Sequence, residues 1–573
     1  MATEQLSGLI SRFAQGGLTR RQVIQRALAL GFTAPVIIAA LASSGAAAPA
    51  GRRGGTAGQR LQIDAQTLVI ADNLKDNWLT LDPGWFYEIN PAAAMNLVYE
   101  PLYTLPDSTK PTEFEALLAA GMPEISEDGL TATIALRPGV TFHNTGNEMT
   151  AEDWVFSWNR LKNIKFQGAF MATDYWSAVE AVDPMTLQIT LVSPNAALVP
   201  ILSSIPLSVV DSAAMRDNGG TDAEDADATD EAREWLNTGV SAGTGPFMLT
   251  AWDIEGEVIV EAFTGYYGEP PALDRIIWRN VVDPNTQLQL VERGEADIAY
   301  SLDPDAAQNV GENDSLQLIT GPTLAHEYLA LNLREDIGGP LANQQVRQAI
   351  GYAIDYDGII ETLLAGAGVK PATIVPLPLL GAEEVQGNGY TLDLTRAQEL
   401  WDASGVGETE ITFSYGAGGQ GEGGVDLETL VAKLQSDLQQ ISGLTIALNP
   451  MDPATRLEEY RAGTLQFTIS GWSPDYPDVH TYAEPFGRTD TAAAKRVGYS
   501  NPEVDQWLDD GIAEADPEAR KDLYVMIQEQ LISDAAFLVL YQPIDQKAAS
   551  AAVQGLQTHS VLMMQLRNVT KSE

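Results

Sequence analysis

The chain has no cysteine among its 573 residues. This absence excludes thiol catalysis, thiolate zinc sites, disulfides and a lipid-modified cysteine anchor. Basic residues are scarce as well, with 33 lysines and arginines against 78 acidic residues and a formal net charge of −45. Because a chain of this charge has little with which to neutralise a row of phosphates, the composition argues against a nucleic-acid partner.

Histidine is also scarce. The four histidines, His143, His326, His480 and His559, are scattered, with no second ligand type at a helical spacing that would make a metal site. We therefore predict no metal site. Residues 217–234 are rich in acidic side chains, but no register has acids at positions one, three and five, glycine at six and glutamate at twelve, as a calcium loop requires. We interpret this tract as a solvated acidic loop.

Two glycine patterns have the spacing of catalytic or cofactor motifs in the wrong context. Gly416, Gly418 and Gly421 match a dinucleotide fingerprint. The loop continues through Glu422, Gly423 and Gly424 before any helix begins, which would place the pyrophosphate far from the helix N-terminus and beside a carboxylate. Residues 239–243 match a nucleophile elbow, but they stand between a predicted helix and a strand, the reverse of the required order. We predict no cofactor and no enzymatic activity.

The amino-terminal residues have the pattern of an export signal. Arg20 and Arg21 precede an apolar run at 27–42, and small residues with Ala-x-Ala cleavage options follow at 43–50. Paired arginines before a moderately apolar segment are typical of twin-arginine export. A single membrane anchor is the alternative, although about 16 residues are short for a hydrocarbon core of about 30 Å. We expect an exported protein that works in the periplasm or at the extracellular face of the cell membrane.

The composition, with 45% hydrophobic and 19% charged residues, is that of a folded globular protein, and the length predicts two or three domains. Strand and helix patterns alternate from residue 68 onward, which predicts an α/β fold. Predicted strands lie at 68–71, 257–263, 275–281, 297–300, 328–333, 411–415, 444–449, 467–470 and 537–541. Predicted helices lie at 91–97, 284–294, 394–403, 427–441, 501–515 and 517–531. A further helix is predicted to begin at 343, with Val346, Ala349, Ile350 and Ala353 facing inward, and the helix 284–294 is predicted to form a strand-helix-strand unit with the strand 297–300.

One predicted hairpin precedes a predicted helix. Residues 130–136 alternate apolar and polar side chains, and a Pro-Gly turn favours pairing with 140–142. Thr150 and Asp153 have the spacing of a capping box. We therefore expect a helix from this point, with its tryptophans in the core.

The loop after the strand at 467–470 is rich in functional groups. Its sequence, GWSPDYPD at 471–478, holds an indole, a phenol and two carboxylates. Such a cluster can bind a cation, because a carboxylate supplies charge and aromatic faces add ~1 kcal/mol each once water is excluded. The alternative is a solvated proline-rich turn whose Trp472 packs on the core.

Several ordered sequence blocks resemble one protein family. They are DGLT and RPGVTFH within 128–143, TAEDWVFS at 150–157, GTGPF at 243–247, RGEAD at 293–297, VRQAI and YAID within 346–355, and YSNPEVD at 499–505. From about residue 68 to 541 the chain resembles the extracytoplasmic solute-binding proteins of the dipeptide and oligopeptide class, family 5, which serve ABC importers. The resemblance implies a two-lobed periplasmic-binding-protein fold of type II, of the large peptide-binding class with an extra subdomain.

The resemblance also implies a peptide site. In peptide-binding relatives the acid three residues after the loop tryptophan pairs with the peptide α-ammonium, and here these are Asp475 and Trp472. An extended segment of the first lobe binds the ligand backbone by strand addition. The expected ligand-binding residues are Gly471, Trp472, Asp475 and Tyr476 in the loop, and Tyr87, Glu88 and Ile89 in the extended segment. The chain departs from the family nearby, with Asp478-Val479 where relatives usually have Asp-Pro.

We therefore predict the substrate-binding component of an ABC importer, a monomer that captures a dipeptide or oligopeptide and delivers it to the membrane permease subunits. The alternatives are the same fold binding an oligosaccharide or a nickel complex, and an exported hydrolase from another class. The two crossings between lobes are predicted at the strands 328–333 and 467–470. The predicted domains are a signal peptide at 1–50, a linker at 51–67, the first lobe at 68–108 and 243–330, its extra subdomain at 109–242, the second lobe at 331–470, and a return to the first lobe with carboxy-terminal helices at 471–573.

Overall fold

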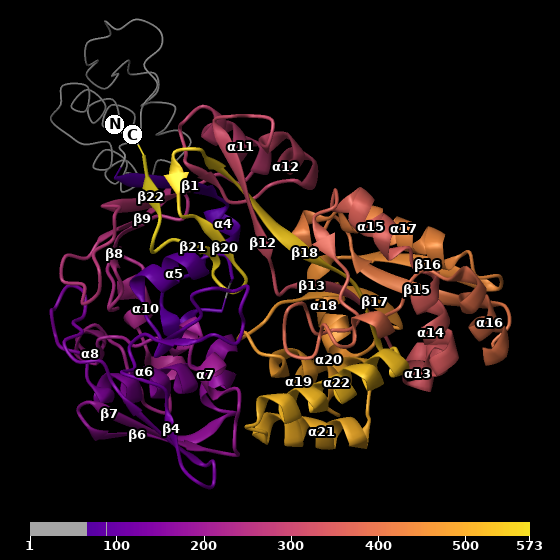
Figure 1. Cartoon of the computed structure of the whole chain (residues 1–573), viewed down its shortest axis with the longest axis horizontal. Helices are drawn as coiled ribbons and strands as arrows, with labels where there is room; N and C mark the ends of the chain where they lie inside the picture. Colours follow the sequence, from indigo (N-terminus) through magenta and orange to yellow (C-terminus); the bar gives the residue numbers. More distant parts are fainter. Residues whose placement is uncertain (1–65, 88, 573) are drawn as a thin grey trace, which may run out of the picture. The chain divides into compact units, whose positions relative to one another are not determined.

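The computed structural model describes residues 66–87 and 89–572 (Figure 1). The predicted signal peptide, the predicted linker up to residue 65, and Glu88 lie outside the described residues. Within the described part, no helix combines the length and the apolar character that a membrane crossing needs. Strands and helices alternate along the chain, which confirms the predicted α/β class.

One half of the main sheet contains the amino-terminal strand. In spatial order its strands are β11 (Ile298–Ala299), β1 (Thr67–Asp72), β10 (Arg275–Asn280), β9 (Glu257–Ala262) and β8 (Phe247–Trp252). β1 is parallel to both of its neighbours, whereas β9 is antiparallel to β10 and to β8. The helix α11 (Pro284–Glu292) connects β10 to β11, so the predicted strand-helix-strand unit is confirmed. Asp283 caps this helix by accepting a hydrogen bond from the backbone of Thr286.

The other half of the sheet contains the later strands. In spatial order they are β16 (Leu444–Met451), β15 (Thr409–Gly416), β17 (Phe467–Trp472) and β13 (His326–Leu331). Figure 1 shows the neighbouring helices α14 (Gln344–Ala353), α15 (Tyr356–Leu363), α16 (Leu394–Ser404) and α17 (Leu427–Leu438). In α14 the predicted inward side chains, among them Val346 and Ile350, are fully buried in one apolar cluster with the strands. Their 3.6-residue spacing explains why the sequence predicted this helix correctly.

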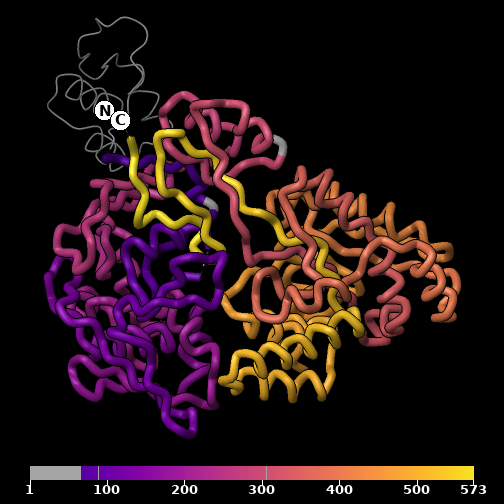
Figure 2. The backbone as a smooth tube through the Cα atoms, in the orientation of Figure 1, coloured from indigo at the N-terminus to yellow at the C-terminus, as the bar shows by residue number. Residues whose placement is uncertain are grey.

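The long strand β18 (Phe537–Ser550) joins the two halves. Its first part pairs with β13, and its remainder pairs with β12 (Leu316–Pro322) and β11. Figure 2 shows β18 in yellow beside β12 and β13. We call the half with β1 the first lobe and the half with β13 the second lobe. The crossings are therefore the β12–β13 connection and β18, so the predicted crossing at 467–470 is wrong.

The extra subdomain is a four-stranded antiparallel sheet covered by a helix. Its strands are β4 (Glu124–Ile125), β5 (Thr131–Ala135), β7 (Thr186–Leu191) and β6 (Trp176–Asp183). β5 pairs with β4 and β7, so the predicted hairpin of 130–136 with 140–142 is wrong. The helix α6 (Ala151–Ile164) begins at the predicted capping box of Thr150 and Asp153. Its Trp154 and Trp158 are buried, as predicted.

Five helices near the carboxy terminus pack on the second lobe. They are α18 (Pro453–Ala462), α19 (His480–Gly487), α20 (Ala492–Val497), α21 (Pro502–Ala513) and α22 (Pro517–Asp534). Tyr460, Tyr482 and Tyr524 from these helices share one apolar cluster with Tyr328 of β13. The helices α19 to α22 of the segment 471–573 therefore lie with the second lobe. The other domain limits stay predictions.

The remaining elements are short. They are α4 (Leu74–Asn77), α5 (Ala92–Val98), β2 (Tyr103–Thr104), β3 (Glu115–Ala116), α7 (Leu198–Ile201), α8 (Ser212–Asp217), α9 (Ala226–Thr229), α10 (Ala232–Leu236), α12 (Pro304–Val310), α13 (Glu335–Gly338), β14 (Gly368–Val369), β19 (Val553–Gln554), β20 (Gln557–His559), β21 (Met563–Gln565) and β22 (Thr570–Lys571). Short 3-10 turns lie at Pro83–Trp85, Gln167–Ala172, Ile205–Leu207, Gly339–Ala342, Gln386–Asn388 and Glu422–Gly424.

The acidic tract at 217–234 is not a wholly solvated loop, which corrects the sequence interpretation. It forms two short helices, and Asp230 between them binds Arg160 of α6 with two hydrogen bonds of 2.7 Å. Arg160 also binds Asp82, and all three side chains are almost fully buried. Asp230 therefore attaches the tract to the subdomain. The sequence did not predict this role, because Asp230 is one of many acidic residues in the tract. Among the described residues no group of acids and histidines is arranged to hold a metal ion.

Candidate functional site

A cavity of about 510 Å³ lies between the two lobes. The first lobe and its subdomain contribute Phe86, Tyr87, Ile89, Met171, Ser204 and Ile205 to its lining. The second lobe contributes the end of β17 and the loop that follows, residues 470–475, together with Leu457, Arg461 and Arg496. Both lobes are thus needed to enclose a ligand here.

Asp475 contacts groups from both lobes. Its Oδ1 accepts a hydrogen bond of 2.7 Å from the hydroxyl of Tyr87, and its backbone oxygen accepts one of 3.3 Å from Ser204. Burial raises the pKa of Asp475, while the hydrogen bonds from Tyr87 and Thr481 act in the opposite direction. No described basic side chain forms an ion pair with Asp475, so a cationic ligand group would supply the missing charge.

Trp472 forms part of the wall beside Asp475. Its indole packs edge-on against Phe486, with ring centroids 5.0 Å apart. The indole Nε1 has no hydrogen-bond partner among the described residues. Gly471 precedes it in the lining, and a Cβ at Gly471 would lie 2.6 Å from the side-chain oxygen of Glu422. The glycine therefore lets the loop that carries Glu422 approach the end of β17.

Tyr476 lies in the core of the extra subdomain and not in the cavity lining. Its side chain is 1% exposed and belongs to the apolar cluster of Trp154 and Trp158. Its hydroxyl lies 3.2 Å from that of Tyr175. Tyr476 therefore connects the loop of the second lobe to the extra subdomain of the first lobe. Its contribution is packing, and its side chain does not face the cavity.

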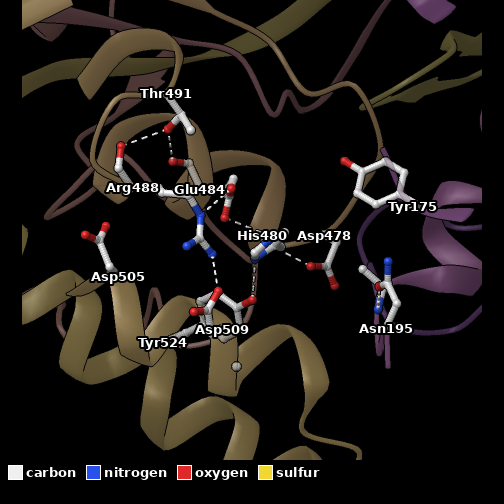
Figure 3. Close-up of polar contacts among 12 residues, drawn as sticks. Tyr175, Asn195, Asp478, His480, Glu484, Arg488, Thr491, Asp505, Asp509 and Tyr524 are labelled. Atoms are coloured by element: carbon white, nitrogen blue, oxygen red, sulfur yellow. Dashed lines mark hydrogen bonds and ion pairs between the residues drawn. The ribbon is translucent and has the colours of Figure 1, made fainter. Parts of the chain in front are cut away.

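A buried ion pair anchors the same loop to the carboxy-terminal helices. Arg520 of α22 donates two hydrogen bonds, of 3.0 and 2.7 Å, to Asp478. Burial favours a raised pKa for Asp478, but the charge and hydrogen bonds of Arg520 outweigh it, so this pKa is below its ordinary value. Figure 3 shows the adjoining cluster, in which His480 lies 2.8 Å from the Tyr524 hydroxyl and 3.3 Å from Glu484. Asp478 is thus structural, and only Asp475 of the two loop carboxylates faces the cavity.

Tyr87 and Ile89, two of the residues predicted to bind the ligand, are in the lining, and Glu88 lies outside the described residues. A second cavity of about 930 Å³ adjoins the first and shares Ile89, Ser473 and Pro474 with it. It extends to Glu422 of the glycine-rich loop. Burial and then the charge of Glu327 raise the pKa of Glu422 to about 8. The dinucleotide-like glycines therefore belong to a loop beside the cleft, and α17 begins only at Leu427 with Asp426 as its N-cap, so its N-terminus does not follow Gly421 directly as a phosphate site would need.

Sequence reasoning missed the two arginines of the lining. Arg461 is in the last turn of α18 and Arg496 in the last turn of α20. Basic residues at helix ends are common because they complement the helix dipole, so neither arginine stood out in the sequence.

A sequence model of the bacterial extracellular solute-binding proteins, family 5 Middle, matches residues 113–494. The chain is 29% identical over 433 residues to the glutathione-binding protein GsiB of Pectobacterium atrosepticum, covering 73% of this chain and 78% of that protein. It is 27% identical over 487 residues to the probable D,D-dipeptide-binding periplasmic protein DdpA of Escherichia coli, covering 84% of this chain and 90% of that protein.

Solved structures show the same fold. DppA of Helicobacter pylori, in complex with the peptide STSA, matches with a TM-score of 0.72 at 22% identity, covering 88% of this chain and 98% of that chain. The substrate-binding protein CtaP of Listeria monocytogenes matches with a TM-score of 0.75 at 22% identity, covering 89% and 100%. These matches confirm the two-lobed periplasmic-binding-protein fold.

Proposed function

Because the chain belongs to the bacterial extracellular solute-binding proteins of family 5, we propose that it captures a peptide by its α-ammonium and delivers it to the permease of an ABC importer. The observation that carries the proposal is Asp475, a carboxylate enclosed by both lobes without a described cationic partner. An ionised group removed from water is costly unless an opposite charge pairs with it. A peptide ammonium supplies that charge together with three hydrogen-bond donors.

The end of β17 offers the backbone contacts that a peptide needs. β13 pairs with β17 as far as Trp472, whereas β15 pairs only with Phe467 and Thr468. One edge of Gly471 and Trp472 is thus not part of a ladder and lies in the cavity lining. An extended ligand can add to this edge, and its binding then depends little on its side chains.

The named relatives support peptide chemistry. GsiB and DdpA are named for binding glutathione and a D,D-dipeptide, and the DppA structure holds a peptide. We propose that this chain, too, binds rather than cleaves its ligand, and that it acts as a monomer. Ligand contacts with both lobes exist only when the cleft is closed, so binding shifts the hinge equilibrium toward the closed form.

Export through the twin-arginine route is part of the proposal. Arg20 and Arg21 precede the apolar run, and a binding protein of this kind meets its ligand outside the cytoplasm. The proposed location is the periplasm or the extracellular face of the cell membrane.

Titration of the mature protein with tri-alanine in a calorimeter tests the proposed function. Asp475→Asn keeps the shape of the side chain and removes its charge, so it should weaken binding by about 100-fold to 1,000-fold. Asp510→Asn is the matched control, because Asp510 is exposed on α21 of the same lobe. Equal loss in both variants, or a loss below about tenfold in Asp475→Asn alone, would contradict recognition of an ammonium. A loss below about tenfold in Asp475→Asn is the result expected if Asp475 instead accepts a hydrogen bond from a sugar hydroxyl.

A further inference from the structure

Two carboxyl side chains lie together where both crossings enter the second lobe. Glu327 of β13 pairs with Gly471 of β17 on one side and with Tyr541 of β18 on the other, and its side chain is buried. Glu422, in the loop between β15 and α17, donates a hydrogen bond of 2.8 Å from its backbone nitrogen to Oε2 of Glu327. The pair is therefore part of the hinge on which the cleft closes.

Glycines allow the loop of Glu422 to approach these strands closely. A Cβ at Gly421 would lie 2.7 Å from Oε2 of Glu327 and 3.1 Å from the Tyr541 hydroxyl. The same hydroxyl donates a hydrogen bond of 3.1 Å to the backbone oxygen of Glu422. Because the Glu422 carboxyl also packs against Gly471, it contacts the strand that lines the cavity of Asp475.

Both carboxyls of the pair favour their protonated forms. Burial raises the pKa of Glu327 to about 7, although the backbone N–H of Glu422 and the charge of Arg456 on α18 oppose the shift. Burial and then the charge of Glu327 raise the pKa of Glu422 to about 8. Since each carboxyl disfavours the charge of the other, the pair retains at least one proton near neutral pH.

The surroundings of Glu422 offer little to stabilise its charge. Tyr541 of β18 and Tyr482 of α19 are neutral, because burial, together with nearby carboxylates that include Glu422, raises the pKa of each phenol. Glu422 itself is half-buried in the wall of the second cavity. The other charged residues described in this wall are Asp283, Asp303, Asp545 and Lys547. Lys547 pairs with Asp545 at 3.0 Å, so the remaining acids favour a neutral Glu422.

We propose that Glu422 and Glu327 form a proton-binding pair that couples closure of the cleft to proton uptake. Tyr300 and Asp303 line the second cavity from the first lobe and Glu422 lines it from the second, so opening the cleft admits water to Glu422. A hydrated carboxyl ionises near its ordinary pKa of 4.5, whereas the enclosed one keeps its proton. The closed form therefore binds more protons than the open form, and ligand capture draws a proton from the solvent. The inference rests on the proposed function in one respect, that a bound peptide closes the cleft.

Peptide affinity should decrease as the solution becomes more alkaline. The contribution of Glu422 to closure is fully present below the pKa of the open form and is lost as pH rises through the pKa of the closed form, about 8. Tri-alanine should therefore bind about tenfold or more tightly at pH 6 than at pH 8. Glu422→Gln keeps the shape of the neutral carboxyl, so its affinity should change by less than about threefold over this range. Glu428→Gln is the matched control, because Glu428 is exposed at the start of α17, and it should behave as the wild type.

Calorimetry of tri-alanine binding at pH 7, in two buffers of different ionisation enthalpy, measures the proton uptake. The wild-type protein should take up about half a proton or more beyond Glu422→Gln. The amine of the peptide contributes equally to both proteins, so the difference between them reports Glu422. Equal proton uptake by the two proteins would overturn the inference.

Small-angle X-ray scattering of the ligand-free protein tests the same coupling without a ligand. The wild-type protein should be more compact at pH 6 than at pH 8, whereas Glu422→Gln should be equally compact at both. Failure of tri-alanine to bind at either pH would contradict the proposed function, and the scattering result would then decide the inference. An identical particle size for the wild-type protein at pH 6 and pH 8 would overturn it.

Discussion

The hydroxyl of Tyr87 donates a hydrogen bond of 2.7 Å to Oδ1 of Asp475. The two residues are 388 positions apart in sequence and belong to different lobes, so this bond exists only when the cleft is closed. It keeps the carboxylate oriented while the pKa of Asp475 is raised by burial.

Tyr87→Phe should weaken peptide binding by about tenfold, because it removes a hydrogen bond to a charged group and a contact that favours closure. Calorimetry with tri-alanine measures the effect. Tyr352→Phe is the control, since Tyr352 is half-buried on α14 away from the cavity. Unchanged affinity in Tyr87→Phe would show that the bond does not contribute to the closed state.

Asp475→Asn should stabilise the ligand-free protein at neutral pH although it weakens binding. The folded pKa of Asp475 is raised above its ordinary value of 3.8, so folding favours the protonated carboxyl. That contribution is fully present below the unfolded pKa and is lost as pH rises through the folded pKa. The variant should therefore melt at a higher temperature than the wild type at pH 7, with the difference disappearing below about pH 4.

Thermal melts of both proteins between pH 3 and pH 8 provide the measurement for this prediction. A lower melting temperature for Asp475→Asn at pH 7 would mean that the hydrogen bonds from Tyr87 and Thr481 outweigh the cost of burial. A carboxylate that serves ligand binding is expected to lower the stability of the ligand-free protein.

Asp478→Asn should destabilise the protein by about 3 to 5 kcal/mol, because it leaves the charge of Arg520 buried and unpaired. Chemical denaturation at pH 7 measures the loss. Asp509→Asn breaks the pair with Arg488, and the Asp509 side chain is 62% exposed, so that variant should cost less than about 1 kcal/mol. Similar losses in the two variants would show that the Asp478 pair does not anchor the loop.

Much of the fold was predictable because its elements bury one face at a regular period. The α14 helix and strands β9 and β10 were found in this way. β18 was predicted only at 537–541, because polar residues from Gln542 onward end the apolar run while the strand itself continues. The hairpin of β5 was misassigned because local turn signals cannot reveal that the distant strand β7 provides the pairing.

The residues of the candidate site that lie close together in the sequence could be predicted. Trp472 and Asp475 are three positions apart in a loop of unusual composition, and both line the cavity. Tyr476 was grouped with them by proximity in sequence, but its side chain lies in the subdomain core. Arg461 and Arg496 come from two separate helix ends, and only tertiary packing brings them to one cavity.

Changing both Arg20 and Arg21 to Lys should leave the precursor in the cytoplasm, because the twin-arginine route requires the arginine pair. Cell fractionation with an antibody against the mature protein measures the distribution. Normal export of the double variant would contradict the twin-arginine assignment and leave the binding proposal unaffected.

The affinity of the wild-type protein for tri-alanine, compared with N-acetyl-tri-alanine, tests the central claim most directly. Acetylation removes the ammonium and leaves Asp475 enclosed without a cationic partner, so binding should weaken by about 100-fold to 1,000-fold. The same comparison in Asp475→Asn should show almost no difference between the two peptides. Equal affinity of the wild-type protein for free and acetylated peptide would contradict recognition of the peptide ammonium by Asp475.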